Sequence, residues 1–129
     1  RALGLGKWTL EDEPAPSGPI PVGAVSGAFF LMGRKAFRKL GGFDEDYFLH
    51  VEDVDLCRRV IEAGGSVVYQ PLAGALHYGA TSKVPSGVVQ DHKARSLARY
   101  FRKFAKGPFE RALVMLARPL IGLVLRMRG

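Results

Sequence analysis

This sequence contains almost no cysteine, and it lacks the short glycine-rich motifs that hold phosphate groups. Its 129 residues include one cysteine, Cys57, which excludes an internal disulfide framework and a zinc site built from several cysteines. We therefore expect Cys57 to be a small buried side chain and the compartment to be the reducing cytosol. No P-loop, GxGxxG or GxSxG pattern is present, so the chemistries that depend on those motifs are excluded.

Two further patterns are also absent. No stretch near the first residue has the basic-then-apolar order of a secretory signal peptide. The acidic run 44–55 is not an EF-hand, because aromatic and aliphatic residues stand where a calcium loop needs oxygen ligands. The chain begins with Arg1 rather than Met, and we expect it to be an excised or processed piece of a longer protein.

Positive charge is abundant and unevenly distributed. The formal net charge is +7, yet residues 1–90 contain nine Lys and Arg against ten Asp and Glu, whereas residues 91–129 contain ten against two. The excess in the tail predicts an anionic partner: membrane lipid, nucleic acid or a phosphorylated substrate. Nucleic acid is the weakest of these, because the basic helices carry no known nucleic-acid motif.

The hydrophobic pattern divides the chain into three parts. Residues 1–21 form an irregular, proline-rich lead-in, residues 22–88 an α/β part, and residues 89–129 a basic amphipathic helical tail. The apolar run 22–32 predicts a strand buried on both faces. Short strands are expected over 66–70 and 75–78, and helices over 34–40, 51–63, 89–106 and 109–127, the last two separated by Gly107-Pro108.

Acidic residues cluster between Asp44 and Asp55. Clustered carboxylates repel one another, so a metal, a basic partner, capping or catalysis must hold them together. Glu52 and Asp53 are adjacent at a predicted helix start, where the helix dipole favours the ionised carboxylate that could accept a proton from a hydroxyl. The alternative is that both acids simply favour helix initiation. His77 is, by itself, either a metal ligand or an ordinary packed residue.

Seven motifs follow one another in the first part of the chain: Val25–Met32, Gly41–Glu45, Tyr47–Leu49, Glu52–Arg59, Ala63-Gly64, Tyr69–Pro71 and His77. In this order they resemble the motifs of family 2 glycosyltransferases, and in particular the bacterial rhamnosyltransferase-like branch. The resemblance covers about residues 22–82. It implies that residues 22–88 are the acceptor-side part of a catalytic domain, the C-terminal half of an α/β fold of the GT-A type with a mixed sheet plus helices.

The resemblance also implies roles for individual residues. Asp53 corresponds to the general base that deprotonates the acceptor hydroxyl, and Glu52 beside it helps to position acceptor or base. His77 corresponds to a histidine that completes the coordination of a divalent metal on the donor diphosphate. Gly27 and Ser26 lie where a strand runs beneath the donor sugar.

A second group of implied roles concerns the loop that borders the acceptor pocket, which contains Phe43, Asp44 and Glu45. For Asp44 a turn or cap is as consistent with the sequence as substrate contact. The implied reaction is an inverting, metal-dependent transfer, with Mg or Mn, from a nucleoside-diphosphate sugar to a hydroxyl of a glycan or lipid-linked acceptor in cell-surface polysaccharide synthesis.

The sequence departs from the family in one respect. The nucleotide-binding Asp and the Asp-x-Asp metal motif of the donor half do not occur before Val22. We therefore expect the isolated chain to be inactive, to bind no divalent metal by itself, and to self-associate through surfaces that the donor half would cover. The alternative is a non-catalytic membrane- or partner-binding module that retains the glycosyltransferase fold.

The tail predicts contact with a membrane surface. Arg111, Arg118 and Arg126 recur at helical spacing, on the side opposite Leu113, Leu116 and Leu120. This pattern is typical of a basic amphipathic helix on an anionic leaflet. We thus expect a peripheral membrane contact through residues 109–129 at the inner face of the cell membrane; packing against other protein is the alternative.

Overall fold

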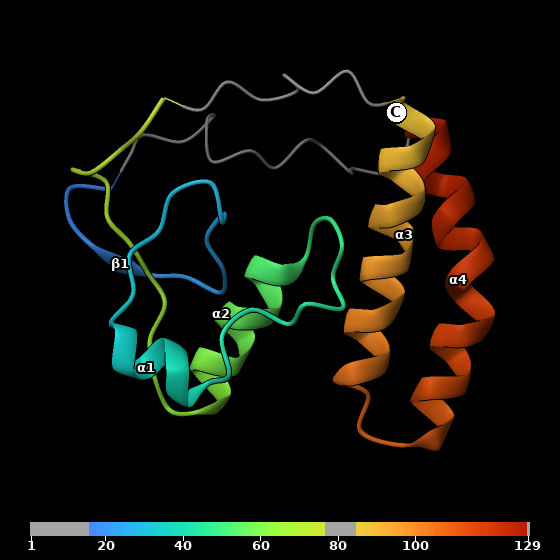
Figure 1. Cartoon of the computed structure of the whole chain (residues 1–129), viewed down its shortest axis with the longest axis horizontal. Coiled ribbons are helices and arrows are strands. Elements are labelled where there is room, and N and C mark those ends of the chain that lie inside the picture. Colours follow the sequence, from blue (N-terminus) through green and yellow to red (C-terminus); the bar gives the residue numbers. More distant parts are fainter. Residues whose placement is uncertain (1–15, 77–84, 129) are drawn as a thin grey trace.

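The computed structural model describes residues 16–76 and 85–128, and this part of the chain is mostly helical (Figure 1). The described elements, in chain order, are β1 (Ile20–Pro21), α1 (Arg34–Lys39), α2 (Glu52–Glu62), β2 (Val68–Tyr69), α3 (Ser86–Lys103) and α4 (Pro108–Arg128). The helices α3 and α4 lie side by side and antiparallel, beside the group formed by the sheet, α1 and α2 (Figure 1), and α3 contacts that group through ion pairs.

The four predicted helices are confirmed, with ends that differ by a few residues. Gly41 and Gly42 follow α1 with φ of +83° and +71°, and Gly64 follows α2 with φ of +80°. Glycine adopts this left-handed backbone without the steric cost of a Cβ atom, so it ends helices well. Pro108 is the first residue of α4, a position where the missing N–H costs nothing.

The prediction of a buried strand over residues 22–32 is wrong. These residues form turns, bends and stretches without regular secondary structure, with the Phe29 side chain 60% exposed and Leu31 fully exposed. An apolar run becomes a buried strand only where neighbouring strands pair with it. In the described part of the chain the neighbour is β2, which pairs only at the start of this run, where the Val22 N–H donates to the Val67 carbonyl at 2.9 Å.

The sheet is correspondingly small. Strands β1 and β2 are antiparallel, with Ile20 opposite Tyr69 and Pro21 opposite Val68. Residues 20–21 were expected to belong to the irregular lead-in, and the strand at 66–70 was expected to be longer. The mixed sheet of the predicted α/β fold is not found among the described residues, where a two-stranded antiparallel sheet stands in its place. Residues 75 and 76 are not in a strand, and 77–78 lie outside the described residues.

A small core lies around α2. Its buried apolar side chains are Tyr47, Val51, Leu56, Cys57, Val67 and Ala94. The Cys57 thiol is free and buried, as expected, and lies 4.0 Å from the Val25 carbonyl. The segment after β1 is thereby held against α2.

Helix α4 exposes a row of apolar side chains to solvent. Phe109, Leu113, Leu116, Leu120 and Leu123 are each at least half exposed, and their spacing places them on one stripe of the helix. In the described residues, no helix combines the length and the apolar character needed to cross a bilayer. The stripe is therefore a surface feature of a helix pair.

Candidate functional site

The candidate site begins with an unusual backbone turn. His50 and Val51 have φ of +63° and +76°, so two residues with side chains adopt the left-handed conformation just before α2. This conformation is costly, especially for a β-branched residue such as Val51, and the buried Val51 side chain helps to hold it. The turn determines where Glu52 and Asp53, the first two residues of α2, are placed.

Asp53 lies against the backbone at Gly27. The Gly27 N–H donates to Asp53 Oδ2 at 2.7 Å, and the Val54 N–H donates to Asp53 Oδ1 at 2.8 Å. A Cβ atom at position 27 would lie 3.3 Å from Asp53 Cβ, closer than most such contacts. Nearby, Ser26 Oγ accepts from the Ala28 N–H at 3.3 Å. The structure thus brings together three of the predicted site residues: Asp53, Gly27 and Ser26.

The two hydrogen bonds leave Asp53 able to act on another group. A carboxylate has about four acceptor positions, and backbone N–H groups occupy only one on each oxygen here. The bonds fix the orientation of the carboxylate while free lone pairs remain. The side chain is partly exposed, so a hydroxyl could reach it.

Glu52 points elsewhere, as adjacent helix positions require. Its Oε2 atom is buried and has no hydrogen-bond partner among the described residues. Buried carboxylate oxygens are normally satisfied, so this atom is available to a donor from outside that part of the chain.

Asp44 is tied to α3. Arg99 Nη2 lies 3.0 and 3.1 Å from its two carboxylate oxygens, Lys103 Nζ lies 2.7 Å away, and the Asp46 N–H donates to Oδ1 at 3.1 Å. Partial burial raises the pKa of this carboxyl, but the bonds from Lys103, the Asp46 N–H and Arg99 outweigh that effect and lower the pKa from 3.8 to about 2. Asp44 therefore forms the turn that the sequence allowed, and it also docks α3.

Asp55 is a structural neighbour of the site that sequence reasoning missed. Its side chain is fully buried; it accepts hydrogen bonds from Tyr47 Oη at 3.1 Å and Arg59 Nε at 2.6 Å, and it forms an ion pair with Lys103 Nζ at 2.6 Å. Burial and the adjacent carboxylate raise the pKa of the Tyr47 hydroxyl. The i, i+4 spacing of Asp55 and Arg59 was the available signal, because such pairs meet on one helix face.

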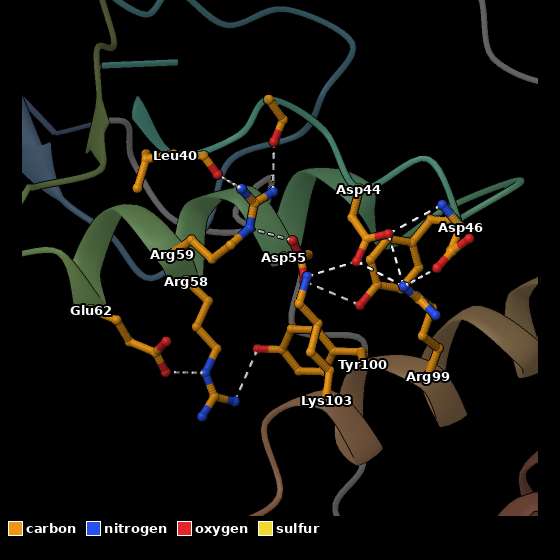
Figure 2. A network of polar contacts seen from close by, with 12 residues as sticks. Leu40, Asp44, Asp46, Asp55, Arg58, Arg59, Glu62, Arg99, Tyr100 and Lys103 are labelled. Atoms are coloured by element: carbon orange, nitrogen blue, oxygen red, sulfur yellow. Dashed lines mark hydrogen bonds and ion pairs between the residues drawn. The ribbon is translucent and has the colours of Figure 1, made fainter. Parts of the chain in front are cut away.

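These residues form one network (Figure 2). Three carboxylates, Asp44, Asp46 and Asp55, are matched by the cations Arg59, Arg99 and Lys103. Arg59 extends it further, since its guanidinium donates to the carbonyls of Leu40 at 2.6 Å and Gly42 at 2.8 Å. Basic side chains of the same chain therefore hold three acids of the cluster, Asp44, Asp46 and Asp55, together. Glu52 and Asp53 remain outside the network.

The remaining predicted acceptor residues lie on the loop after α1. The Phe43 ring packs edge-on against Phe30 and Phe37, with ring centroids 5.8 and 5.5 Å apart. Glu45 is exposed on the same loop. Phe43 thus fixes the loop to the segment that carries Gly27.

The described residues do not form a metal site. Across residues 16–76 and 85–128, no group of three or more His, Cys, Asp or Glu side chains is arranged to hold an ion. His77, the predicted ligand, lies outside the described residues.

Comparison with known proteins shows that part of this chain is homologous to bacterial glycosyltransferases, and more narrowly to rhamnosyltransferases of family 2. Over 62 residues it is 52% identical to the N-acetylglucosaminyl-diphospho-decaprenol L-rhamnosyltransferase of Mycobacterium tuberculosis, a match that covers 48% of this chain and 20% of the relative. It is 37% identical over 76 residues to rhamnosyltransferase WbbL of Escherichia coli, covering 59% and 28%.

A third relative, the pre-mycofactocin glycosyltransferase of Mycobacterium tuberculosis, is 46% identical over 57 residues, covering 43% of this chain and 12% of the relative. The chain thus matches between 12% and 28% of the length of these curated relatives. No family model matches the chain, and no solved structure does.

Proposed function

We propose that this chain supplies the general base and part of the acceptor site of an inverting glycosyltransferase. The observation that carries the proposal is the Asp53 carboxylate, held at 2.7 Å by the Gly27 N–H at the start of α2. The partial homology to rhamnosyltransferases supports it. On that basis the donor is a nucleoside-diphosphate rhamnose, and the acceptor is a sugar linked to a lipid diphosphate.

In this reaction the Asp53 carboxylate takes the proton from the acceptor hydroxyl. The hydroxyl oxygen forms its bond to the anomeric carbon as the bond from that carbon to the leaving diphosphate breaks, which inverts the configuration. Gly27 orients the base through its N–H, and its lack of a side chain leaves the approach to Asp53 open. Glu52, Phe43, Asp44 and Glu45 are proposed to shape or border the acceptor pocket.

A divalent metal would neutralise charge on the leaving diphosphate. The described residues do not form a site for it, so we assign no step to the ion here. His77 as one of its ligands remains a proposal, as does the inactivity of the 129 residues without a donor-binding part.

The test is Asp53→Asn in the full-length enzyme that contains this chain, assayed for rhamnosyl transfer. Loss of the base should lower kcat by about 100-fold or more, with unchanged thermal unfolding. Glu62→Gln, on the same helix, removes the same charge from an exposed i, i+4 pair with Arg58 and should retain activity. Turnover within about tenfold of wild type, or about 1.4 kcal/mol of barrier, would show that Asp53 is not the base.

The contact with Gly27 can be tested separately. In Gly27→Ala the new Cβ would press on Asp53, so kcat should fall several-fold while KM changes less. Gly23→Ala is the matched control, because a Cβ there meets nothing within 4 Å. Equal kcat in the two variants would contradict the proposed orienting role of Gly27.

A second candidate function, peripheral membrane binding, is favoured by the exposed apolar stripe of α4. The stripe opposes the arginines of the same helix, which suits a helix at the boundary between lipid and water. This contact would bring the base near a lipid-linked acceptor at the inner face of the membrane. Membrane binding alone would also suit a non-catalytic module. Loss of transfer in Asp53→Asn would favour the enzyme over such a module.

A further inference from the structure

A groove of about 510 Å³ lies between α3, α4 and the loop before α2. Its polar lining includes Arg95, Arg99 and Arg102 from α3 and Arg118 from α4, and its apolar lining includes Phe48 and Met115. The Phe48 ring also stacks on His92 of α3, with centroids 4.4 Å apart. Four guanidinium groups therefore share one cavity with aromatic and aliphatic walls.

Helical spacing explains why these cations gather. Arg95, Arg99 and Arg102 follow one another at i, i+4 and i+7, which places them on one face of α3. The antiparallel packing of α4 brings Arg118 to the same groove. A second groove of about 330 Å³ shares Arg95 and Arg118 and continues along the helix pair past Pro119.

The positive charge of the groove is largely unmatched within the described residues. Arg99 pairs with Asp44 and Asp46, and Asp46 is the one carboxylate in the lining of the first groove. Among the described residues, 16–76 and 85–128, no ion pair is formed by Arg95, Arg102 or Arg118. Like charges held close together repel, so an anion would stabilise this arrangement.

We propose that this groove binds a diphosphate group that carries an apolar chain. A diphosphate offers several oxygens with two or three negative charges, and guanidinium forks bind such oxygens in pairs. Arg95 and Arg102 are about 10 Å apart along the helix, from seven residues at about 1.5 Å each, which is a span that a diphosphate and its first linked group can fill. Phe48 and Met115 provide the contact for the apolar chain.

The nature of the carrier rests on the proposed function, since a lipid-diphosphate acceptor would present both parts at once. Affinity for diphosphate itself follows from the groove alone. The site is separate from Asp53, because neither Asp53 nor Gly27 lines either groove.

The experiment is calorimetric titration of the full chain with farnesyl diphosphate below its micelle concentration, alongside inorganic pyrophosphate and a nucleoside diphosphate. Farnesyl diphosphate should bind at least about tenfold more tightly than pyrophosphate, because burial of its first few chain carbons adds affinity. Arg95→Gln with Arg118→Gln should weaken both ligands by about tenfold or more, since each charged hydrogen bond contributes about that factor.

Arg111→Gln is the control, because it removes one positive charge from α4 at a residue that lines neither groove. The affinity of this variant for farnesyl diphosphate should stay within about twofold of wild type. Arg95→Lys with Arg118→Lys keeps the charge and should lose part of the affinity. All three arginine positions in these variants are exposed, and thermal unfolding checks the folding of each variant.

Equal affinity in the double Gln variant and in Arg111→Gln would overturn the proposal. So would a nucleoside diphosphate that binds as tightly as farnesyl diphosphate. Asp53→Asn should bind farnesyl diphosphate normally. Failure of the base assignment and failure of the groove assignment are therefore distinguishable.

Discussion

At the scale of single residues, two aspartates of one helix turn have different environments. Asp53 is partly exposed and bonded only to backbone N–H groups, whereas Asp55 is fully buried among Tyr47, Arg59 and Lys103. The first arrangement leaves a carboxylate able to accept a proton, and the second fixes it as a structural anion. Both occur in one acidic run that the sequence presents as uniform.

The pKa of Asp44 predicts loss of stability in acid. Because this carboxyl titrates near 2 in the folded chain rather than at 3.8, the unfolded chain binds a proton more readily as the pH falls. The contribution of Asp44, about 1–2 kcal/mol after allowance for solvent, is present above pH 4 and lost between about pH 4 and pH 2. Urea unfolding at a series of pH values measures it.

Asp44→Asn should remove that part of the pH dependence and lower stability at pH 7. Glu45→Gln, one residue away and exposed, serves as the control and should leave the profile as it is. An Asp44→Asn protein with the wild-type loss of stability between pH 4 and pH 2 would rule out this role.

At the scale of elements, the helices could be predicted and the sheet could not. Apolar periodicity and glycine stops are local signals, and they located α1, α2, α3 and α4 to within a few residues. The run 22–32 had the composition of a buried strand, but a strand exists only where another pairs with it, which local composition does not encode.

The docking of α3 was also beyond prediction from sequence. Asp44 bonds to Arg99 and Lys103, 55 and 59 residues further along the chain. The acidic cluster and the basic tail were each recognised, and the sequence does not say that they pair. The candidate site was partly predictable: Asp53 and Gly27 do meet, while Asp55 and Arg59 were not recognised as its support.

Lys103 should be the principal cation that fixes α3 to α2. It lies 2.7 Å from Asp44 and 2.6 Å from Asp55, so Lys103→Met leaves a buried carboxylate with one donor fewer. We expect unfolding free energy to fall by about 2 kcal/mol, together with faster amide hydrogen exchange along α3. Lys93→Met, on the same helix, should change both by much less; similar losses in the two variants would contradict this role for Lys103.

At the scale of the whole molecule, more large apolar side chains are exposed than buried in the described residues. The stripe on α4 is the most continuous of these surfaces, and such patches serve association with protein or membrane. Self-association of the chain through surfaces that the donor half would cover stays a prediction, as does contact of the α4 stripe with a membrane.

Flotation with liposomes tests the membrane contact. The chain should float with vesicles that contain anionic lipid and less with neutral ones. Leu116→Gln with Leu120→Gln should reduce binding about tenfold or more, because each leucine contributes about 1.5–3 kcal/mol when buried. Leu72→Gln with Leu76→Gln is the control, since both leucines are exposed elsewhere. Equal flotation with both lipid mixtures would remove the membrane claim.

The left-handed turn at His50 and Val51 has a consequence for communication between the two proposed sites. The loop that lines the arginine groove with Asp46 and Phe48 continues directly into this turn, which sets the start of the helix that carries Asp53. The same strained turn therefore joins the wall of the groove to the first residues of α2, and we expect a substitution that relaxes it, such as Val51→Gly, to disturb both the groove and the placement of the Asp53 carboxylate.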